Sequence, residues 1–408
     1  MRTVEEHQRV VAGLICHRPA TALPLPDTLG LVLAVDVTAP LSLPIFDNSA
    51  MDGYAVLASD ITGASSDTPV TLPVAEDIPA GRTDALTLKP GTAHRIMTGA
   101  PLPAGATAVV PVEVTDAGTE TVEIRATAAA GQHLRHAGED VTAGTTVLRA
   151  GQVVTPAALG LAAALGLGEL TVWPRQRVLV MSTGTELVAS GTALEPGQIY
   201  ESNAVMLAAA VRDAGGEVIA APMASDDVDE FRAALNAHVG AEKEGVDLII
   251  TTGGVSAGAY EVVKDALGGD SPATNQVDFV KVAMQPGMPQ GAGRVAGLPI
   301  ITLPGNPVSA LVSFEVFIRP ALRAAMAFPQ AGRPVRTAVL TEQLTSPRGK
   351  RQFRRGVLDA EAGTVTSYGP PASHHLRWLA SANCLLEIAE DVTEVDAGAT
   401  VRVWDLSG

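Results

Sequence analysis

Hydrophobic positions change their pattern near residue 175. Beyond that point, short runs that are apolar on both faces alternate with amphipathic segments of helical period. Runs of the first kind predict buried strands, and the amphipathic segments predict helices between them. We expect strands at 177–184, 216–225, 246–254 and 299–305, and helices at 202–216, 229–239 and 306–318. This alternation predicts a parallel sheet in a doubly wound α/β domain.

The rest of the chain follows other patterns. Helical periodicity opens the chain, gives way to a proline-rich stretch and returns near residue 141. Between these parts, short apolar runs punctuated by Gly, Pro and Asp predict a β-rich insertion. The predicted fold class is therefore multidomain α/β plus β. We expect a helical and extended linking domain at 1–45 and 141–174, a β-rich inserted domain at 46–140, a doubly wound α/β domain at 175–328 and a small C-terminal β domain at 329–408.

Composition narrows the classes of partner. The 408 residues suffice for several domains, and 28 Lys and Arg against 44 Asp and Glu give a net charge of −16. A net negative charge of this size repels nucleic acid and anionic membranes, so an anionic ligand must be held by a local site. The most apolar stretch, 157–172, contains three glycines and is too short for a membrane span. Two distant cysteines and the absence of a signal-like N-terminus favour a reducing, cytoplasmic compartment.

Three predicted strand ends share one design. Gly and hydroxyl residues occur in each loop between a predicted strand and the helix that follows it. These loops are STGTEL (182–187), TTGGVSAG (251–258) and LPGNPVSA (303–310). Ligands of α/β sheets bind at the carboxyl ends of strands, where glycines let backbone N–H groups approach an anion. One such loop is more often a plain turn or cap. Three in one domain favour a site for a phosphate or another oxyanion.

These loops, in this order, resemble the molybdopterin-binding fold. FDNSAMDGYAV (46–56) and RIMTGAPLPAGATAVVPVE (95–113) make the chain resemble the MoeA and gephyrin E-domain family, and HLRHAGEDV, FRRG and ASHHL extend the resemblance along the chain. The resemblance implies a molybdopterin molybdenumtransferase that uses molybdate, adenylated molybdopterin and Mg²⁺ and releases AMP. It also implies a homodimer whose sites combine the β-rich domain of one subunit with the α/β domain of the other. A molybdopterin adenylyltransferase is an expected partner.

The resemblance also implies roles for individual residues. Catalytic roles fall to Asp52, Thr98, Asp140, Glu186, Lys281, Arg355 and Ser373. Substrate binding falls to Arg135, Ser182, Gly184, Gly253, Gly254, Ser256, Gly258, Pro304, Gly305, Asn306 and Pro307. Glu186, Asp226 and Glu261 would hold Mg²⁺, which prefers oxygen ligands. From the residues alone, Asp226 or Asp227 could instead cap a helix, and Lys281 could extend from a half-buried strand.

Two other functions stay open at this stage. Many family members carry further lysines where this chain has Gln285 and Met288, and usually an Asp where it has Ala259. These departures keep open a non-catalytic molybdopterin carrier or gephyrin-like scaffold. The adenylyltransferase reaction is disfavoured, because its proteins are single α/β domains. We propose no metal role for His374 and His375, since adjacent residues on a strand point to opposite faces.

Overall fold

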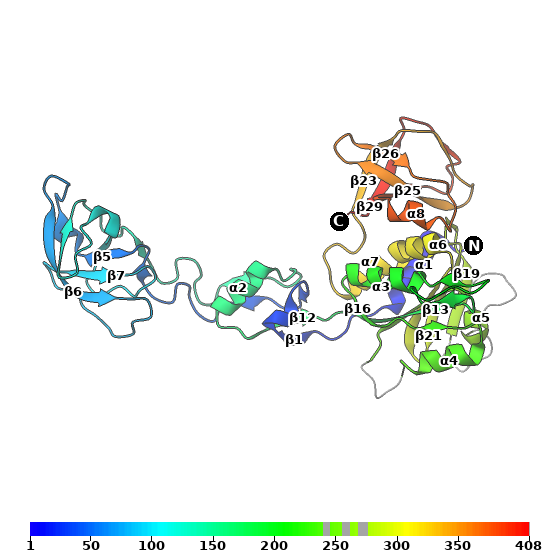
Figure 1. Ribbon diagram of the computed structural model, residues 1–408, viewed down its shortest axis with the longest axis horizontal. Coiled ribbons are helices and arrows are strands. Elements are labelled where there is room, and N and C mark those ends of the chain that lie inside the picture. Colours follow the sequence, from blue (N-terminus) through cyan, green and yellow to red (C-terminus); the bar gives the residue numbers. More distant parts are fainter. Residues whose placement is uncertain (240–244, 255–261, 268–275, 408) are drawn as a thin grey trace.

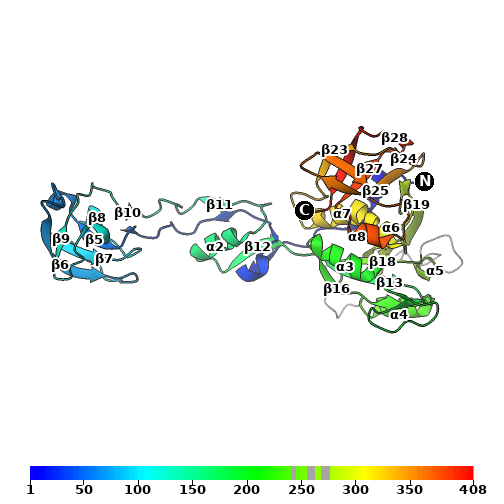
Figure 2. The same cartoon turned by 45° about the horizontal axis from the view of Figure 1, so that its top comes forward.

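The computed structural model describes the whole chain except residues 240–244, 255–261, 268–275 and 408. The molecule is elongated (Figure 1). One end holds an α/β domain beside a small β domain, the other end holds a β-rich domain, and a narrow middle part joins them. The same arrangement is seen after rotation (Figure 2). Within the described residues, no helix combines the length and apolar character that crossing a membrane requires.

A mixed sheet forms the centre of the α/β domain. Its strand order is β16-β13-β18-β22-β21-β19, with β17 also beside β13. The expected parallel pairing is found for β16, β13, β18 and β22, and the antiparallel strands β21 and β19 extend that sheet. A turn at Ala296 and Gly297, both with positive φ, reverses the chain between β21 and β22. The strands are β13 (Arg177–Thr183), β16 (Glu217–Ala220), β17 (Met223–Ala224), β18 (Leu248–Thr252), β19 (Gln276–Lys281), β21 (Pro289–Val295) and β22 (Leu298–Leu303).

Helices cover both faces of this sheet. Val178 and Val180 of β13 face a core shared with α3, α6, η4 and α7, whereas Leu179 and Met181 face a second core shared with α4 and α5. Strict alternation along one strand thus gives two buried faces, as a doubly wound domain requires. The helices are α3 (Asn203–Asp213), α4 (Val228–Asn236), α5 (Val262–Leu267), α6 (Pro307–Ser313), the π-helix η4 (Phe314–Ile318) and α7 (Arg319–Ala325).

The first helix packs on the α/β domain, which differs from the expected grouping with the linking segment. Helix α1 (Val4–Leu14) begins with a capping box between Thr3 and Glu6. Its buried Val4 and Val11 join the core of α3 and α6, and Gln8 Nε2 donates to the Val316 carbonyl at 3.1 Å. An apolar stripe predicts that a helix packs against a core, but only tertiary contacts show which domain supplies that core.

The middle part joins two distant stretches of chain. Strands from residues 21–38 pair with strands from residues 146–173, and Leu33, Val154, Ala162 and Val172 share a small core. The middle part therefore has its own packing. Its elements are β1 (Thr21–Pro24), η1 (Leu25–Thr28), β2 (Val32–Leu33), β3 (Val37–Thr38), β11 (Thr146–Leu148), α2 (Pro156–Ala164) and β12 (Glu169–Trp173).

Both remaining domains are built from short strands, as expected. The far domain contains a sheet of order β8-β5-β7-β6-β9 and the pair β4 and β10. In the C-terminal domain, pairing of β25 with β27 closes β25, β26, β23, β29 and β27 into a small barrel. The far domain has β4 (Asn48–Ser49), β5 (Gly53–Val56), η2 (Ala58–Ile61), β6 (Val70–Ile78), β7 (Ala93–Ile96), β8 (Ala108–Pro111), η3 (Val112–Val114), β9 (Thr121–Ile124) and β10 (Leu134–Arg135). The C-terminal domain has β23 (Val335–Leu340), β24 (Leu344–Thr345), β25 (Arg351–Asp359), β26 (Thr364–Ser367), α8 (Leu376–Ala380), β27 (Cys384–Ile388), β28 (Glu394–Val395) and β29 (Thr400–Asp405).

Strand pairing and a buried ion pair are among the contacts that attach the barrel and its linker to the α/β domain. Strand β20 (Met284–Gln285), which follows β19 in the chain, pairs with β25 of the barrel. In addition, the linker residue Arg333 donates from Nε to Glu315 Oε2 at 2.9 Å and from Nη2 to Asp213 Oδ2 at 2.7 Å. Glu315 is only 3% exposed and lies in the π-helix η4. A buried carboxylate of this kind requires its cationic partner.

We expect Glu315→Ala to lower the free energy of unfolding by about 3 kcal/mol, because it removes one partner from a buried ion pair. Urea unfolding followed by tryptophan fluorescence measures this change, since Trp404 packs against the core that contains η4. Glu361→Ala is the matched control, because Glu361 is exposed and should change stability by less than about 0.5 kcal/mol. Equal stability of the two variants would contradict the assigned role of Glu315.

Candidate functional site

An open cleft of about 640 Å³ lies at the carboxyl ends of β13, β18 and β22. The loops after these three strands form its floor, and residues just before α8 form part of its wall. Because parallel strands end at one edge of a sheet, the three loops singled out in the sequence come together here. Among the residues predicted from the sequence, the cleft is lined by Ser182, Gly184, Glu186, Asp226, Gly253, Gly254, Gly305, Asn306 and Pro307.

Bare backbone forms much of this floor. Gly253 has φ +96°, and a Cβ there would lie 2.7 Å from the carbonyl oxygen of Thr183. A Cβ on Gly184 would lie 2.7 Å from Glu186 Oε2. Both positions favour glycine. Their own N–H groups donate within the chain, from Gly253 to the Leu303 carbonyl and from Gly184 to the Ala224 carbonyl, each at 3.1 Å. Asn306 precedes α6 without capping it through its side chain.

A cluster that sequence reasoning missed holds the floor together. The buried carboxylate of Glu201 accepts from Ser182 Oγ at 2.8 Å and from the Ala204 backbone N–H at 2.6 Å. Asn203 Nδ2 donates to the Gly305 carbonyl at 2.6 Å and to Thr252 Oγ1 at 3.1 Å. These bonds join the loops after all three strands. The polar run Glu201-Ser202-Asn203 at a helix start was the available signal, but it is also an ordinary capping pattern.

The two neighbouring aspartates have different tasks. Asp227 caps α4, because its side chain accepts from the N–H groups of Asp229 and Glu230, each at 2.9 Å. Asp226 instead accepts from the Thr185 N–H at 3.1 Å and lines the cleft together with Glu186. The capping interpretation is therefore confirmed for Asp227. Asp226 is left for a ligand.

Mg²⁺ fits the donors found here. Asp226 and Glu186 offer only oxygen atoms, and Mg²⁺ commonly binds one or two carboxylates while substrate oxygens and waters complete its shell. No cluster of three or more His, Cys, Asp or Glu suited to a metal occurs among the residues that the structure describes. Three residues expected in the site, Ser256, Gly258 and Glu261, lie outside the described residues.

A second hollow of about 520 Å³ adjoins the cleft and shares Gly305, Asn306 and His374 with it. Pro304 and Ser373 line this hollow, as do Gln285 and Met288, the two residues that depart from the family pattern. Lys281 lies nearby at the exposed end of β19, where its backbone is the register partner of Pro289. Pro289 also lines the hollow, so the Lys281 backbone lies beside the hollow rather than in its lining.

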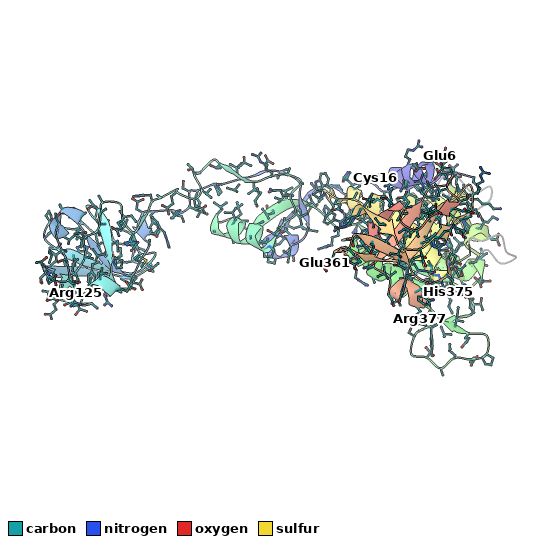
Figure 3. All side chains as sticks on the ribbon, turned by 90° about the horizontal axis from the view of Figure 1, so that it is seen from above. Glu6, Cys16, Arg125, Glu361, His375 and Arg377 are labelled. Carbon is teal, nitrogen blue, oxygen red and sulfur yellow. The ribbon has the colours of Figure 1, made fainter. Side chains whose placement is uncertain are left out.

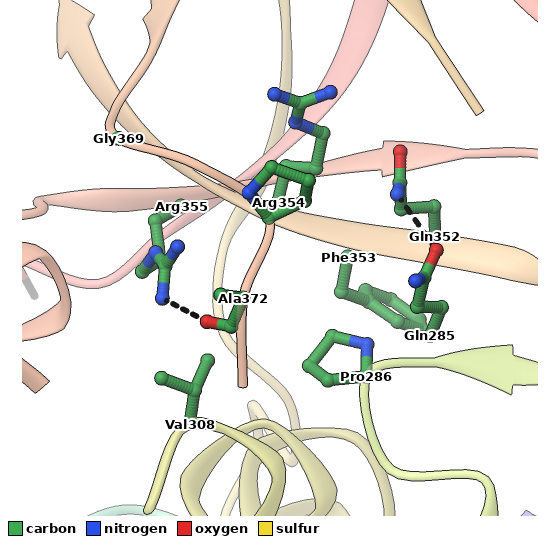
Figure 4. A pocket seen from close by; sticks show the side chains of 10 residues that line it. Gln285, Pro286, Val308, Gln352, Phe353, Arg354, Arg355, Gly369 and Ala372 are labelled. Carbon is green, nitrogen blue, oxygen red and sulfur yellow. Dashed lines mark hydrogen bonds between the residues drawn. The ribbon is translucent and has the colours of Figure 1, made fainter. Parts of the chain in front are cut away.

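Arg355 contacts the site through a loop (Figure 4). Its buried guanidinium donates from Nη1 to the Ala372 carbonyl at 3.0 Å and from Nη2 to the Pro370 carbonyl. The loop held in this way carries Ser373. The resemblance implies a catalytic role for Arg355, and in the structure its hydrogen bonds to backbone carbonyls order the loop. The Gln352 and Gln285 side chains meet nearby at 2.9 Å.

The other predicted residues lie at the far end of the molecule. Asp52 Oδ1 accepts from both the hydroxyl and the backbone N–H of Thr98, each at 2.6 Å. Arg135, in β10, and Asp140, whose N–H donates to the Leu43 carbonyl, belong to the same end. Figure 3 shows the separation, with Arg125 of the far domain at one end and His375 and Arg377 at the other. A single chain therefore does not bring this group to the cleft.

Comparisons with known proteins cover the chain almost completely. Three family profiles match: the MoeA N-terminal region (domain I and II) at 2–166, a probable molybdopterin binding domain at 179–324 and the MoeA C-terminal region (domain IV) at 337–406. Molybdopterin molybdenumtransferase 2 of Mycobacterium tuberculosis is 68% identical over 410 residues and covers 100% of both chains. Molybdopterin molybdenumtransferase of Bacillus subtilis is 34% identical, over 93% of this chain and 88% of its own. A crystal structure of the molybdopterin biosynthesis MoeA protein from Pyrococcus horikoshii has a TM-score of 0.78 at 29% identity, over 100% of this chain and 99% of that one.

The side-chain hydroxyl and the backbone N–H of Thr98 hold the pKa of Asp52 below its usual 3.8. Any stability that this pair contributes is therefore present above pH 3.8 and is lost as the pH falls through the lowered pKa. We expect Thr98→Val to raise the pKa of Asp52 towards 3.8, which a carboxyl NMR titration measures directly. Asp116 is the internal reference, since the Glu123 N–H holds its pKa low. An unchanged Asp52 titration would show that the hydroxyl bond is not made in solution.

Proposed function

The chain belongs to the MoeA family of molybdopterin molybdenumtransferases, and from this premise we propose that the cleft at the three strand ends is its active site. The protein is an enzyme of molybdenum cofactor biosynthesis and inserts molybdenum into molybdopterin. In our proposal molybdate supplies the metal, adenylated molybdopterin receives it, and AMP is released with the help of Mg²⁺. The observation that carries the proposal is the meeting of glycine loops, hydroxyl groups and the carboxylates of Glu186, Glu201 and Asp226 in one cleft.

We assign the phosphate groups of the substrate to the cleft floor. Glycine loops at strand ends offer backbone N–H groups to anions, and the adjacent hydroxyl and amide side chains add further polar contacts. Such fixed donors hold a substrate in place without reorganising during the reaction. Positioning and charge neutralisation then supply the catalysis, and no nucleophilic side chain is required. The assigned residues are Ser182, Gly184, Gly253, Gly254, Pro304, Gly305, Asn306 and Pro307.

Asp226 and Glu186 would hold Mg²⁺ at the side of this floor. When bound, the ion neutralises phosphate oxygens of the substrate. The hydrogen bond from Thr185 fixes the Asp226 carboxylate in place, so its remaining lone pairs stay available. A net charge of −16 does not prevent phosphate binding here, because the favourable charges and dipoles are local.

We propose that molybdate enters through the adjoining hollow. Ser373 lines this hollow and offers a hydroxyl group to an oxyanion, while Arg355 keeps the loop of Ser373 in place. Lys281 lies at the exposed end of β19 beside the hollow and adds positive charge to the approach. The hollow and the cleft share Gly305, Asn306 and His374, so molybdate and the substrate would meet at these three residues.

We further propose that two copies of the chain complete each site. Asp52, Thr98, Arg135 and Asp140 lie far from the cleft of their own chain (Figures 1 and 3). An elongated molecule with these groups at one end and the cleft at the other suits a homodimer in which each far domain reaches the partner's cleft. The composite site would then place the Asp52 and Thr98 pair of one chain opposite Glu186 of the other.

Partners and location follow from the same chemistry. A molybdopterin adenylyltransferase is the proposed source of the substrate, because its reaction forms the adenylyl bond that this one breaks. Cys16 is exposed, Cys384 is buried, and both are free thiols, which supports a reducing cytoplasmic compartment. The net charge of −16 disfavours nucleic acid and anionic membranes as partners.

The proposed reaction is tested by AMP release from adenylated molybdopterin with Mg²⁺, in the presence and absence of molybdate. We expect release that depends on molybdate and is lost with EDTA. Asp226→Asn should raise the Mg²⁺ concentration needed for half-maximal release by about tenfold, because it removes one charge from an ion ligand. Asp227→Asn is the matched control, since Asp227 caps α4 and should leave the Mg²⁺ dependence unchanged. Tight substrate binding without AMP release would contradict an enzymatic role and indicate a carrier.

The composite site is tested by mixing two inactive variants. Asp52→Ala and Lys281→Ala remove groups that the proposal places on opposite chains of one site. Hybrid dimers then contain one intact site, so the mixture should recover up to about a quarter of the wild-type rate with random exchange. Subunit exchange is followed with differently tagged chains. If subunits exchange but the mixture recovers no activity, the composite-site proposal is wrong.

A further inference from the structure

A flap of residues 187–200 projects beside the cleft. Its two short strands, β14 (Leu187–Val188) and β15 (Ile199–Tyr200), pair in parallel, and the loop between them is largely exposed. Ile199 is 53% exposed and Tyr200 is 43% exposed, and both line the cleft. Water contacts these apolar groups at the mouth of a ligand site. The exposure therefore calls for a functional explanation.

The ring of Tyr200 is held in position. Its hydroxyl donates to the Thr192 carbonyl at 2.7 Å, across the flap. Aromatic residues make up only 3% of the chain. Among the described residues, the exposed large hydrophobic side chains include just two aromatic ones, Phe46 and Tyr200. A fixed, exposed ring presents a flat apolar face at little further cost in conformational entropy.

The flap is attached firmly to the polar floor. At its start, the Leu187 N–H donates to the Gly184 carbonyl at 3.2 Å, and the Ile199 N–H donates to the Glu186 carbonyl at 2.9 Å. At its end, the buried Glu201 binds Ser182 Oγ. These bonds fix the spacing between the Tyr200 ring and the floor that suits phosphate. The cleft lining also includes Leu376, which is 37% exposed, from the start of α8.

We propose that Tyr200 and Ile199 form a platform on which the planar heteroaromatic ring of the substrate packs, with Leu376 as a further apolar residue of the lining. The inference rests on the proposed function, because it takes the phosphate groups to lie on the cleft floor. Two parts of adenylated molybdopterin share the required chemistry, the adenine and the pterin, since each is flat and is linked to phosphate. Stacking on an aromatic side chain serves either ring, because every such ring has a π-face.

The platform is tested by calorimetric titration of the full-length protein with AMP and, separately, with molybdopterin that lacks the adenylyl group. Tyr200→Ala should weaken binding of at least one of these ligands by about tenfold, as loss of one stacking partner does. Tyr200→Phe keeps the ring and should stay within about threefold of wild type. Leu194→Ala is the matched control, since Leu194 is an exposed flap residue outside the cleft lining and its loss should change neither affinity.

The two ligands identify the ring. Weaker AMP binding alone assigns the platform to adenine, and weaker molybdopterin binding alone assigns it to the pterin. Unchanged affinity for both ligands overturns the proposal. A changed association state in sedimentation, again with both affinities unchanged, overturns it as well and assigns the flap to a contact between copies. These titrations need neither molybdate nor turnover, so the platform and the proposed reaction can fail independently.

Discussion

The side-by-side ending of three buried parallel strands is the constraint on which the site depends. β13, β18 and β22 are buried on both faces, so their register is fixed by two separate cores. Their loops must then converge at one edge of the sheet, and Asn203 bonds two of these loops while Glu201 anchors the third. The glycines of these loops leave no room for side chains, which turns the same edge into an open polar floor.

Carboxylates in this part of the molecule divide by environment. Glu201 and Glu315 are buried, and each accepts hydrogen bonds from donors of the chain itself, Glu201 through Oε1 and Glu315 through both oxygens, as burial of charge demands. Asp226 and Glu186 stand at the cleft, where solvent or a ligand can reach them. The buried carboxylates thus stabilise the structure, and the accessible ones are those to which we assign Mg²⁺ binding. The two cationic residues differ in the same way. Arg355 is buried and donates hydrogen bonds to a loop, whereas Lys281 is exposed at the end of a strand.

The elongated shape of the molecule separates the Asp52 and Thr98 pair from the cleft. The Asp52 and Thr98 pair is complete as a local arrangement, yet it lies at the opposite end from the cleft (Figure 2). Likewise, the Tyr200 ring is fixed by the bond from its hydroxyl to Thr192 and lines the cleft together with Ile199, Leu187 and Leu376. In our proposals the complement of each feature comes from outside the single chain, from a second copy in one case and from a substrate ring in the other.

The sequence by itself determined the strand and helix alternation after residue 175, the β-rich character of both flanking regions, and the three glycine loops. Each of these depends on residues close together in the chain, through side-chain alternation and turn geometry. Only the tertiary structure decided that Asp227 caps a helix while Asp226 faces the cleft, that α1 packs on the α/β domain, and that Glu201 and Asn203 tie the floor together. The tertiary structure also showed that Arg355 donates to backbone carbonyls of the loop that carries Ser373. These choices depend on contacts between residues far apart in the chain, and local pattern carries no information about which distant group will satisfy a given donor or acceptor.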